Sequence, residues 1–534
     1  MVTTRNPGIE VEEERGPDQS IPRLYAARTA FVGRTLRGPV NRPILLKSFT
    51  EFQHAFGGLW QPSSLGYAVE QFFDHGGREA LVVRVVNGAR AATLSLRAGK
   101  STLKLRAVRP GTREFLRASV DYDNIAPGDT ASFNLTVQRV RAQGTAQVED
   151  QEIYRKLSLS PAAESYLPRV VAGSELIELV DEPPPERPDR TLDAASGLAT
   201  GYVASSSDGD DGAPLTDYDL IGSPTDRSGI FALDDADHFS FLCLPPLSRE
   251  RDVGLSALWV GARYCRDRRA LLIVDPPSRW LTADDALAGM RDWDLFNESA
   301  VMYFPRVLAL DKLRGHFEAF APCGAAAGML ARADEASPVW SFSRSDEAVL
   351  RPGYRPTCLV SEDRRVRLAS FGVNTIQAVR SAARIGVAAR TLAAGSADNA
   401  DWKYLAPRRF ALFVLNSIER GTRWAAIMAQ PHAEVAEQVS SQVRAFFGAL
   451  QADQAFGPEA AGPEPFFVAC GGQGTEYQLV LGFVARLAPG LHSFRITHSV
   501  KGSAVRGLTL GQLGAQMSPA ELEWVDGLAQ RLFH

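Results

Sequence analysis

Two hydrophobic periodicities divide the chain into regions of different secondary structure. Within residues 88–185, apolar and polar residues alternate over Thr93–Val108 and Ser132–Val140, and Pro-Gly pairs interrupt the pattern. An alternation with a period of two predicts strands that are buried on one face, so this region is predicted to be an all-β module. Short apolar runs lie on both sides of it and predict fully buried strands. These runs are Thr29–Val32, Ala80–Val86, Phe239–Pro246, Arg268–Pro277 and Val301–Val307.

Helical patterns accompany the buried runs. Ser48–Phe56 is predicted to be a short helix. Gly66–His75 is predicted to be a helix closed by two glycines, because glycine accepts the left-handed backbone found after a helix C-terminus. Val253–Cys265 and Thr282–Arg291 are predicted to be helices between and after the later strands. Strands that alternate with helices predict an α/β region on both sides of the β-rich module.

The hydrophobic pattern of residues 401–534 predicts a third region, in which helices precede strands. Amphipathic helices are predicted at Ala406–Glu419 and Ala433–Ala449, with a strand at Trp424–Met428 between them. Three further strands are predicted at Pro465–Cys470, Glu476–Leu487 and Leu491–Ser499. A Ser-Pro-x-Glu capping box that begins at Ser518 predicts a short helix near the C-terminus.

The N-terminal segment Asn6–Glu14 has the pattern of a strand but no sheet of its own. Ile9 and Val11 face one side of the predicted strand, and Glu10 and Glu12 face the other. Pro-Gly before the segment and Gly-Pro after it separate it from the rest of the chain. A single strand is not stable in water, so we expect this arm to pair with the edge of a sheet, in the same chain or in another copy.

The composition predicts a soluble multidomain protein. Of 534 residues, 45% are apolar, which is enough for roughly three or four domains. The net charge of −4 and the pI of about 6.1 argue against a general nucleic-acid binder. Five widely spaced cysteines without a CxxC pair predict reduced thiols in a protein folded in the cytoplasm. The sequence shows no signal peptide and no apolar run that approaches the ~18 residues of a membrane span.

The motifs of catalysis and of metal or nucleotide binding are incomplete in this sequence. Gly99–Thr102 reads GKST, like the end of a phosphate-binding loop, but Leu94 stands where such a loop needs glycine. Cys470–Gly474 is predicted to be a turn between strands, and the acidic run Ser207–Asp219 departs from the calcium-ligand order of an EF-hand. Asp275 follows a strand but has no base nearby in sequence, so we expect it to cap local backbone. We therefore predict no catalytic residue, no metal and no cofactor.

The order of the segments resembles the contractile tail sheath proteins of phages and phage-like injection systems. In the N-terminal part, the matching residues are the arm, AFVG at Ala30–Gly33 and RGPV at Arg37–Val40. The resemblance is strongest from LCLPP at Leu242 onwards, and includes Ala321–Trp340 and Phe371–Ala393. The strings PGTREFL, FNLTV and KLSLSP resemble a domain that is inserted in the sheath proteins of injection systems.

This resemblance implies a multidomain α/β (α+β) tail-sheath fold with an inserted all-β module and a C-terminal α/β domain that takes part in strand exchange between subunits. The implied parts are a linking arm at 1–22, a middle domain built from 23–87 and 198–400, the inserted module at 88–197, a C-terminal domain at 401–500 and an extension at 501–534.

The resemblance also implies a function. Subunits of the family stack as hexameric rings around an inner tube, and they contract without ATP to drive the tube through a target envelope. The implied partners are further copies of the chain, the inner tube protein, baseplate and terminator or cap proteins, and sheath paralogues, with no nucleic acid and no membrane insertion. Assembly is expected in the bacterial cytoplasm, as part of a phage tail or tail-like particle. The inserted module favours a toxin injector over a phage or a bacteriocin-like particle.

Two sets of site residues are implied by the family. Neighbouring subunits exchange strands, so linking residues are expected in the arm and in the last predicted strand: Gly8, Ile9, Glu10, Val11, Glu12, Phe494, Arg495 and Ile496. The acceptor sheet is expected around Glu476–Leu487 and Leu491–Ser499. The C-terminal domain lines the lumen in the family, so five side chains are expected to face the tube: Arg408, Arg409, Glu419, Arg420 and Arg423.

Departures from the family pattern leave two other hypotheses open. The segments after Trp340 and Trp424 are degenerate, and the chain continues past Ser499, which suits a divergent sheath paralogue near the baseplate or cap. An α/β hydrolase-type enzyme is a more distant alternative, which only Asp275 and the Gly-rich turns support.

Overall fold

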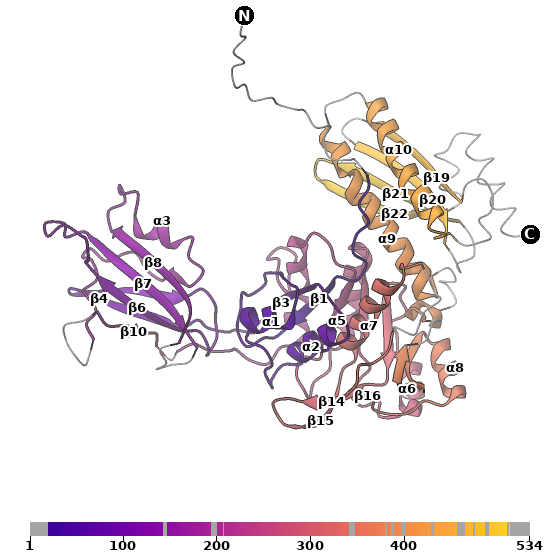
Figure 1. Ribbon diagram of the computed structural model, residues 1–534, viewed down its shortest axis with the longest axis horizontal. Coiled ribbons are helices and arrows are strands. Elements are labelled where there is room, and N and C mark those ends of the chain that lie inside the picture. The colour runs from indigo at the N-terminus through magenta and orange to yellow at the C-terminus, as the bar shows by residue number, and fades with distance from the viewer. Residues whose placement is uncertain are drawn as a thin grey trace, which may run out of the picture.

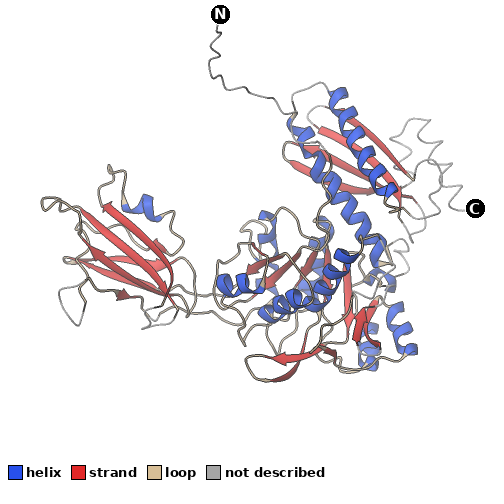
Figure 2. Ribbon diagram, viewed as in Figure 1, coloured by secondary structure: helices blue, strands red, loops and turns tan. Residues whose placement is uncertain are grey.

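The computed structural model describes residues 20–141, 147–193, 200–206, 208–340, 348–379, 382–385, 389–396, 402–428, 432–456, 465–473, 476–485, 491–509 and 512. Figure 1 shows three bodies: a β-rich body at one end, a central body, and a C-terminal body at the other end. In Figure 2 the first is almost entirely strand, whereas the other two combine helices with sheets.

An eight-stranded sheet forms the centre of the fold, and two distant segments of the chain build it. Its strand order is β18-β17-β13-β12-β11-β1-β3-β2. β1 (Thr29–Gly33) pairs in parallel with β3 (Ala80–Arg84) on one side and with β11 (Phe241–Cys243) on the other. The other strands are β12 (Leu271–Val274), β13 (Ala300–Phe304) and β17 (Val373–Val379), which are parallel, and β2 (Ile44–Leu46) and β18 (Ala382–Ile385), which are antiparallel at the edges.

Side chains of the central strands alternate between two hydrophobic cores. Phe31, Phe241 and their equivalents face the first core, whose helices are α1 (Phe49–Phe56), α2 (Leu65–Asp74) and α7 (Cys323–Ala336). Ala30, Leu242 and their equivalents face the second, whose helices are α5 (Leu255–Asp267) and α6 (Ala283–Gly289). Because both faces are covered, the strands are apolar at every position. The buried runs predicted from the sequence are confirmed as strands of this sheet.

Shorter elements complete the central body. They are α4 (Asp217–Ile221), η1 (Gly229–Asp235), η2 (Met290–Asp292), β14 (Val307–Asp311), β15 (His316–Phe320), β16 (Arg355–Pro356), α8 (Glu362–Ser370) and η3 (Leu392–Gly395). β14 pairs with β15 and with β16 in a separate three-stranded sheet.

The β-rich body contains two sheets that enclose one apolar core. The strand orders are β10-β6-β7-β8 and β4-β5-β9. The elements are β4 (Thr93–Ala98), β5 (Ser101–Ala107), β6 (Phe115–Asp121), β7 (Ser132–Val140), β8 (Val148–Ser158), α3 (Leu167–Val171), β9 (Ile177–Leu179) and β10 (Val203–Ala204). The GKST segment lies at the turn from β4 to β5, where no helix follows to bind phosphate. β10 lies past residue 197, so the β-rich body extends beyond the predicted limit.

Buried charges hold the β-rich body against the central body. Arg84, at the end of β3, is 1% exposed and donates hydrogen bonds to the backbone oxygens of Gly38 at 2.7 Å and Pro110 at 2.9 Å. Arg37 pairs with Glu149 of the β-rich body at 2.5 Å. A buried guanidinium needs specific partners, so these contacts favour one orientation of the β-rich body.

The C-terminal body contains two long helices and a four-stranded sheet. Its elements are α9 (Leu405–Thr422), η4 (Arg423–Ile427), α10 (His432–Ala452), β19 (Phe466–Gln473), β20 (Glu476–Val484), β21 (Leu491–Ser499) and β22 (Gly502–Leu508). The predicted strand at Trp424–Met428 is wrong, because a 3₁₀ turn continues α9 there. The helix also runs past Gly421, where a Cβ atom would lie 3.0 Å from the side chain of Ile21. The helix predicted after Ser518 lies outside the described residues.

The cysteines have the environments predicted for them. All five are free, with Cys243, Cys265 and Cys323 buried and Cys358 and Cys470 partly buried. Among the described helices, none combines the length and the apolar character that a membrane crossing requires.

Gly324 tests the contact between α2 and α7 on which the first core depends. A Cβ atom at Gly324 would lie 2.0 Å from the backbone oxygen of Ala68 in α2, so Gly324→Ala forces the two helices apart. We expect a loss of about 1–3 kcal/mol in the free energy of unfolding, measured by denaturant titration. Gly448→Ala, in α10, is the control, because it meets no atom within 4 Å and should stabilise the chain. An unchanged midpoint for Gly324→Ala would contradict the close contact.

Candidate functional site

Among the described residues, the C-terminal sheet has two edge strands, β19 and β22, that pair with a neighbour on one side only. Its strand order is β19-β20-β21-β22, and each neighbouring pair is antiparallel. One face packs through Phe483 and Ile496 against Phe410 of α9 and Phe447 of α10. No strand of the described chain pairs with the outer side of β19 or of β22. An open edge presents N–H and C=O groups to which another strand can add.

The structure assigns the predicted linking residues Phe494, Arg495 and Ile496 to an inner strand. Each residue of β21 from Ser493 to His498 pairs with β20 on one side and with β22 on the other. The backbone of these residues is therefore used within the chain, and the open edge next to them belongs to β22. Sequence reasoning missed β22 because its sequence, GSAVRGL, contains two glycines and only one β-branched residue.

Two arginines stand opposite each other on β21 and β22. Arg495 and Arg506 are direct partners in the antiparallel register. Like charges in this position destabilise a pair of strands. The Nε atom of Arg495 is buried and has no hydrogen-bond partner within the described chain. On the opposite face, Val505 packs against the apolar core that contains Ile496. This edge is therefore basic on one face and apolar on the other.

The segment that leads to the N-terminal arm is fixed on the C-terminal body. Ile21 is 6% exposed and packs against Gly421 of α9. Arg23 pairs with Asp453 at 2.6 Å. The predicted linking residues Gly8–Glu12 precede this anchor and lie outside the described residues. The arm is thus rooted beside the sheet that has the open edges.

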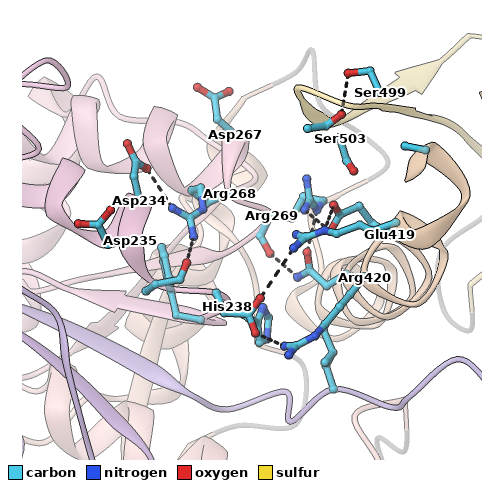
Figure 3. Close-up of a pocket in the computed structure, with 18 of the residues that line it drawn as sticks. Asp234, Asp235, His238, Asp267, Arg268, Arg269, Glu419, Arg420, Ser499 and Ser503 are labelled. Carbon is cyan, nitrogen blue, oxygen red and sulfur yellow. Dashed lines mark hydrogen bonds and ion pairs between the residues drawn. The ribbon is translucent and has the colours of Figure 1, made fainter. Parts of the chain in front are cut away.

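A cavity of about 590 Å³, lined by many charged residues, lies between the C-terminal body and the central body. Its walls are η1 and the segment before β11, the end of α5, the end of α9 with η4, and the turn from β21 to β22. Figure 3 shows Arg268 and Arg269 from the end of α5, and Glu419 and Arg420 from α9, around this space. The cavity therefore marks the joint between the two bodies.

Glu419 is the centre of the ion pairs in the joint. Its carboxylate is 3% exposed and accepts hydrogen bonds from Arg269 at 3.1 Å and Arg423 at 2.7 Å. Burial raises the pKa of Glu419, but the charges of Arg423 and Arg269 outweigh this effect and the net pKa lies below its usual value. Arg420 and Arg423 also approach Asp237 of the central body. The joint is therefore held by ionised groups from both bodies.

The five side chains predicted to face an inner tube have different environments. Arg408 is 7% exposed, and burial lowers its pKa to about 10. Arg409 pairs with the buried carboxylate of Asp334, and the carboxylate of Glu419 is used in the joint. These three charges are enclosed within the chain. Arg420 and Arg423 keep side-chain exposures of 40% and 48%, so they retain surface for a partner.

His498 connects the end of α9 to the turn between β21 and β22. Its Nε2 atom lies 2.8 Å from Oγ1 of Thr422, and its Nδ1 atom lies 2.7 Å from Oγ of Ser503. The ring is 1% exposed, and burial lowers its pKa to about 4. A neutral imidazole donates one hydrogen bond and accepts the other, whereas a protonated ring in this site would carry a buried charge.

The strand-end aspartate singled out in the sequence has a structural contact. Oδ1 of Asp275 accepts the backbone N–H of Cys323, in the first turn of α7, at 2.8 Å. Asp275 therefore caps backbone as predicted, but the backbone belongs to α7, 48 residues further along the chain, and is not local. Burial raises its pKa to about 6. In the ranges that the structure describes, no group of three or more His, Cys, Asp or Glu side chains is placed to hold a metal ion.

Removal of the central carboxylate tests the joint. Glu419→Ala leaves Arg269 buried beside Arg423 without a countercharge, so we expect a loss of about 3 kcal/mol in the free energy of unfolding of the C-terminal body. Denaturant titration followed by the fluorescence of the eight tryptophans measures the loss. Asp284→Ala is the control, because Asp284 pairs with Arg364 at the surface. Equal midpoints for the two variants would show that the joint does not depend on Glu419.

The buried ring of His498 makes the same body sensitive to pH. The unfolded chain takes up the proton near pH 6.5, but the folded chain does so only near pH 4. The contribution of His498 to stability is therefore full above pH 6.5 and is lost as the pH falls from about 6.5 to about 4. His498→Gln should lose less stability than the unmodified chain over this interval, measured by unfolding at fixed pH values. Parallel losses in both proteins would contradict this assignment.

Comparisons with known proteins identify the fold. No family model and no curated protein matches the sequence. The sheath tail protein of Listeria innocua is similar in structure, with a TM-score of 0.59 and 12% identity over 90% of this chain and 96% of that chain. The sheath tail protein of Desulfitobacterium hafniense has a TM-score of 0.50 and 13% identity over 92% and 100%. A helical sheath chain of the anti-feeding prophage, in the contracted state, has a TM-score of 0.49 and 14% identity over 91% and 96%.

The first two similarities include all three bodies, because they cover at least nine-tenths of this chain. The mixed α/β multidomain architecture predicted from the sequence is confirmed by them. This chain has the fold of the sheath tail proteins.

Proposed function

We propose that this chain is a structural subunit of the contractile sheath of a phage tail-like injection system. Copies of it would stack as hexameric rings around an inner tube and contract to drive that tube through a target envelope. The observation that carries the proposal is the sheath fold over 90% of the chain, together with an open β22 edge beside the root of the N-terminal arm. A subunit that joins its copies by strand addition needs an open sheet edge and a segment that can add to it as a strand.

The linking joint in this proposal is the arm of one copy on the β22 edge of another. The arm has Ile9 and Val11 on one face and Glu10 and Glu12 on the other. The β22 edge is apolar on the face of Val505 and basic on the opposite face. An added arm strand would extend the apolar face with Ile9 and Val11, and it would bring two carboxylates to the paired arginines of β21 and β22. The acceptor is therefore β22, and Phe494, Arg495 and Ile496 would support it from the inner strand.

The anchor at Ile21 limits where the acceptor can lie. Ile21 lies seven positions after Glu14, and an extended chain spans roughly 3.3–3.6 Å per residue. The arm strand of one copy must therefore end within roughly 25 Å of its own α9. In a closely packed ring, this distance reaches the C-terminal body of an adjacent copy. Head-to-tail addition of the arm gives a ring where the rotation between copies closes, and an open helical array where it does not.

The divisions of the chain suit different tasks in this proposal. The regions 23–87 and 198–400 would form the body of the sheath wall, 88–197 a projecting module, and 401–500 the lumen-facing domain. Arg420 and Arg423 would be the tube-facing charges, because they keep exposed surface at the joint. The arm at 1–22 and the residues beyond β22 would contact other copies, whereas β22 itself, within the predicted extension 501–534, belongs to the C-terminal body. Baseplate and terminator proteins would meet the array at its ends.

In this proposal, contraction is a change between two arrangements of the interfaces between copies. A change between two arrangements needs only a difference in their free energy, so no nucleotide is required. The strand joint would survive the change, because backbone hydrogen bonds hold it while the segment after the arm bends. The proposed role is structural, and it assigns no catalytic task to Asp275.

Deletion of residues 1–16 tests the linking arm. We expect a folded monomer that no longer polymerises, because the deletion removes the strand and leaves the anchor at Ile21 in place. Negative-stain microscopy of the full chain and of the truncated chain, at matched concentrations, gives the comparison. Circular dichroism of the truncated chain is the control for folding. Intact tubes from the truncated chain would contradict the linking role of the arm.

A charge exchange tests the acceptor edge. Arg506→Glu places a carboxylate opposite the arm of the neighbouring copy, so polymerisation should fall at low salt. The combined variant with Glu10→Lys and Glu12→Lys should recover it, because the complementary charges are restored. Arg155→Glu, at an exposed position of β8 in the β-rich body, is the control. Equal polymerisation of the single and the combined variants would refute β22 as the acceptor.

A further inference from the structure

The C-terminal sheet has an outer face, on the side away from α9 and α10. β19 contains the run FFVAC and β20 the run LVLGFV, so both strands are apolar on this face as well as on the core face. The register sets Phe467 opposite Gly482, and Ala469 opposite Val480. A Cβ atom at Gly482 would lie 2.1 Å from the ring of Phe467, so this ring lies across the neighbouring strand. Strands that are apolar on both faces are typical of a sheet that is covered on both sides.

The apolar part of the outer face is shielded from water, although α9 and α10 lie on the other side of the sheet. Phe467 is 7% exposed and Val480 is 8% exposed, yet neither belongs to the core that these helices cover. Ile153, on the outer face of the edge strand β8, is 51% exposed. Neighbours within a sheet therefore do not explain the low exposure of Phe467 and Val480. These exposures belong to a single copy, so the cover comes from the same chain.

Four stretches outside the described residues adjoin the strands of this sheet: 457–464, 474–475, 486–490 and the stretch after β22. The first three together contain one large apolar side chain, that of Leu487. The C-terminal tail, defined as residues 513–534, is rich in such side chains. They are Leu513, Met517, Leu522, Trp524, Val525, Leu528, Leu532 and Phe533. Because an apolar surface needs apolar side chains to cover it, the composition of these stretches selects the tail.

The sequence of the tail has the pattern of an amphipathic helix. Its capping box and its apolar spacing predict a helix over Ser518–Phe533, with Leu522, Val525 and Leu532 on one side. Asp526 follows Leu522 by one turn, at the border of that side. A helix of this length spans about 24 Å, and the nine residues of β20 span about 30 Å. The predicted helix therefore fits along the strands of the sheet.

The tail starts close to the surface that it would cover. Leu508, the last residue of β22, stands opposite Ser493 of β21, in the same row of the sheet as Phe467. Nine residues separate Leu508 from Ser518, and such a segment reaches roughly 30 Å when it is extended. Neighbouring strands are about 4.8 Å apart, so the sheet measures only about 14 Å from β22 to β19. The tail can therefore reach every strand of its own sheet.

Charges on the outer face complement the border of the predicted helix. Arg495 of β21 stands beside Val480 in the register, and its Nε atom is buried without a hydrogen-bond partner in the described chain. Arg506 of β22 is its direct neighbour on the other side, so the two guanidinium groups need separate carboxylates. Asp526 can supply one to Arg495 from above the sheet. Arg506, on the edge strand, then remains for the carboxylates of an added arm.

We propose that residues 518–533 form a helix that packs on the outer face of the C-terminal sheet of the same chain. Its apolar side would cover Phe467 and Val480, and Asp526 would face Arg495. The contact lies within one chain, so the proposal does not rest on the sheath function. A sheet with helices on both faces leaves only its edges for association, which directs an added strand to β22. The side of the helix that faces away from the sheet, which carries Arg531, remains available for contacts with other copies.

Thiol labelling of Val480→Cys tests the cover. The variant is prepared in the full chain and in a chain that ends at Gln512, and peptide mass spectrometry measures the maleimide label at position 480 alone. We expect labelling to be about tenfold faster in the shortened chain, because the tail no longer has to move away. Ile153→Cys is the control, and it should be labelled equally in both chains. Circular dichroism compares the folding of the two chains.

Two outcomes of the labelling would overturn the proposal. Equal rates at position 480 in the full and the shortened chain would show that the tail does not cover this face. A rate in the full chain that falls as the protein concentration rises would place the tail on another copy. A slow rate that does not depend on concentration, and that the truncation abolishes, is the result expected for a tail packed on its own sheet.

A second comparison keeps the chain at full length. Val525→Asp places a charge on the apolar side of the predicted helix, whereas Gln530→Asp places the same charge on its opposite side. Amide hydrogen exchange of residues 520–533 is measured by mass spectrometry in both variants and in the unmodified chain. We expect exchange to be about tenfold faster in Val525→Asp and little changed in Gln530→Asp, because only the first variant removes the helix from the sheet. Equal exchange in the two variants would overturn the proposal.

Discussion

The parallel pairing of β1 with β3 and with β11 is the contact on which the rest of the fold depends. β1 and β3 come from the first part of the chain, and β11 to β13 follow after the β-rich body. Because β1 joins these two groups of strands, one sheet can carry helices on both faces and hold two cores. The β-rich body can then project from the sheet at the point where the chain leaves β3, and it adds nothing to the central hydrogen bonds.

Charged groups fix the neighbouring bodies on this sheet. Arg84 and Arg37 hold the β-rich body, and Glu419 with Arg269 and Arg423 holds the C-terminal body. Apolar packing is weakly directional, whereas a buried ion pair requires particular partners at particular positions. Each projecting body therefore has a defined orientation. A defined orientation of each body is required of the proposed sheath subunit, because surfaces on different bodies must contact different neighbouring copies at the same time.

The C-terminal body combines a complete core with an incomplete sheet. Its helices cover one face, yet the β22 edge keeps open backbone groups and a pair of like charges. This arrangement makes sense if copies of this chain complete one another by strand addition.

Much of the fold and part of the candidate site could be read from local patterns. Alternation and apolar runs predicted the strands of the central and β-rich bodies, and the composition of the arm predicted a strand that needs a partner. Three features required the tertiary structure. Gly421 lies inside α9 because Ile21, from the far end of the chain, packs against it. β22 could not be predicted from the sequence, because it is a strand through its pairing with β21 and not through its own propensity.

The burial of Arg408 and Arg409 was the third feature. An arginine on a helix is expected to be exposed when only the sequence is known, because its partners are not visible there. The sequence by itself determined the strands and helices that have a clear periodicity or cap, because periodicity and capping are local. The tertiary structure alone decided which edge is open and which charges are enclosed, because these depend on residues that are distant in the chain.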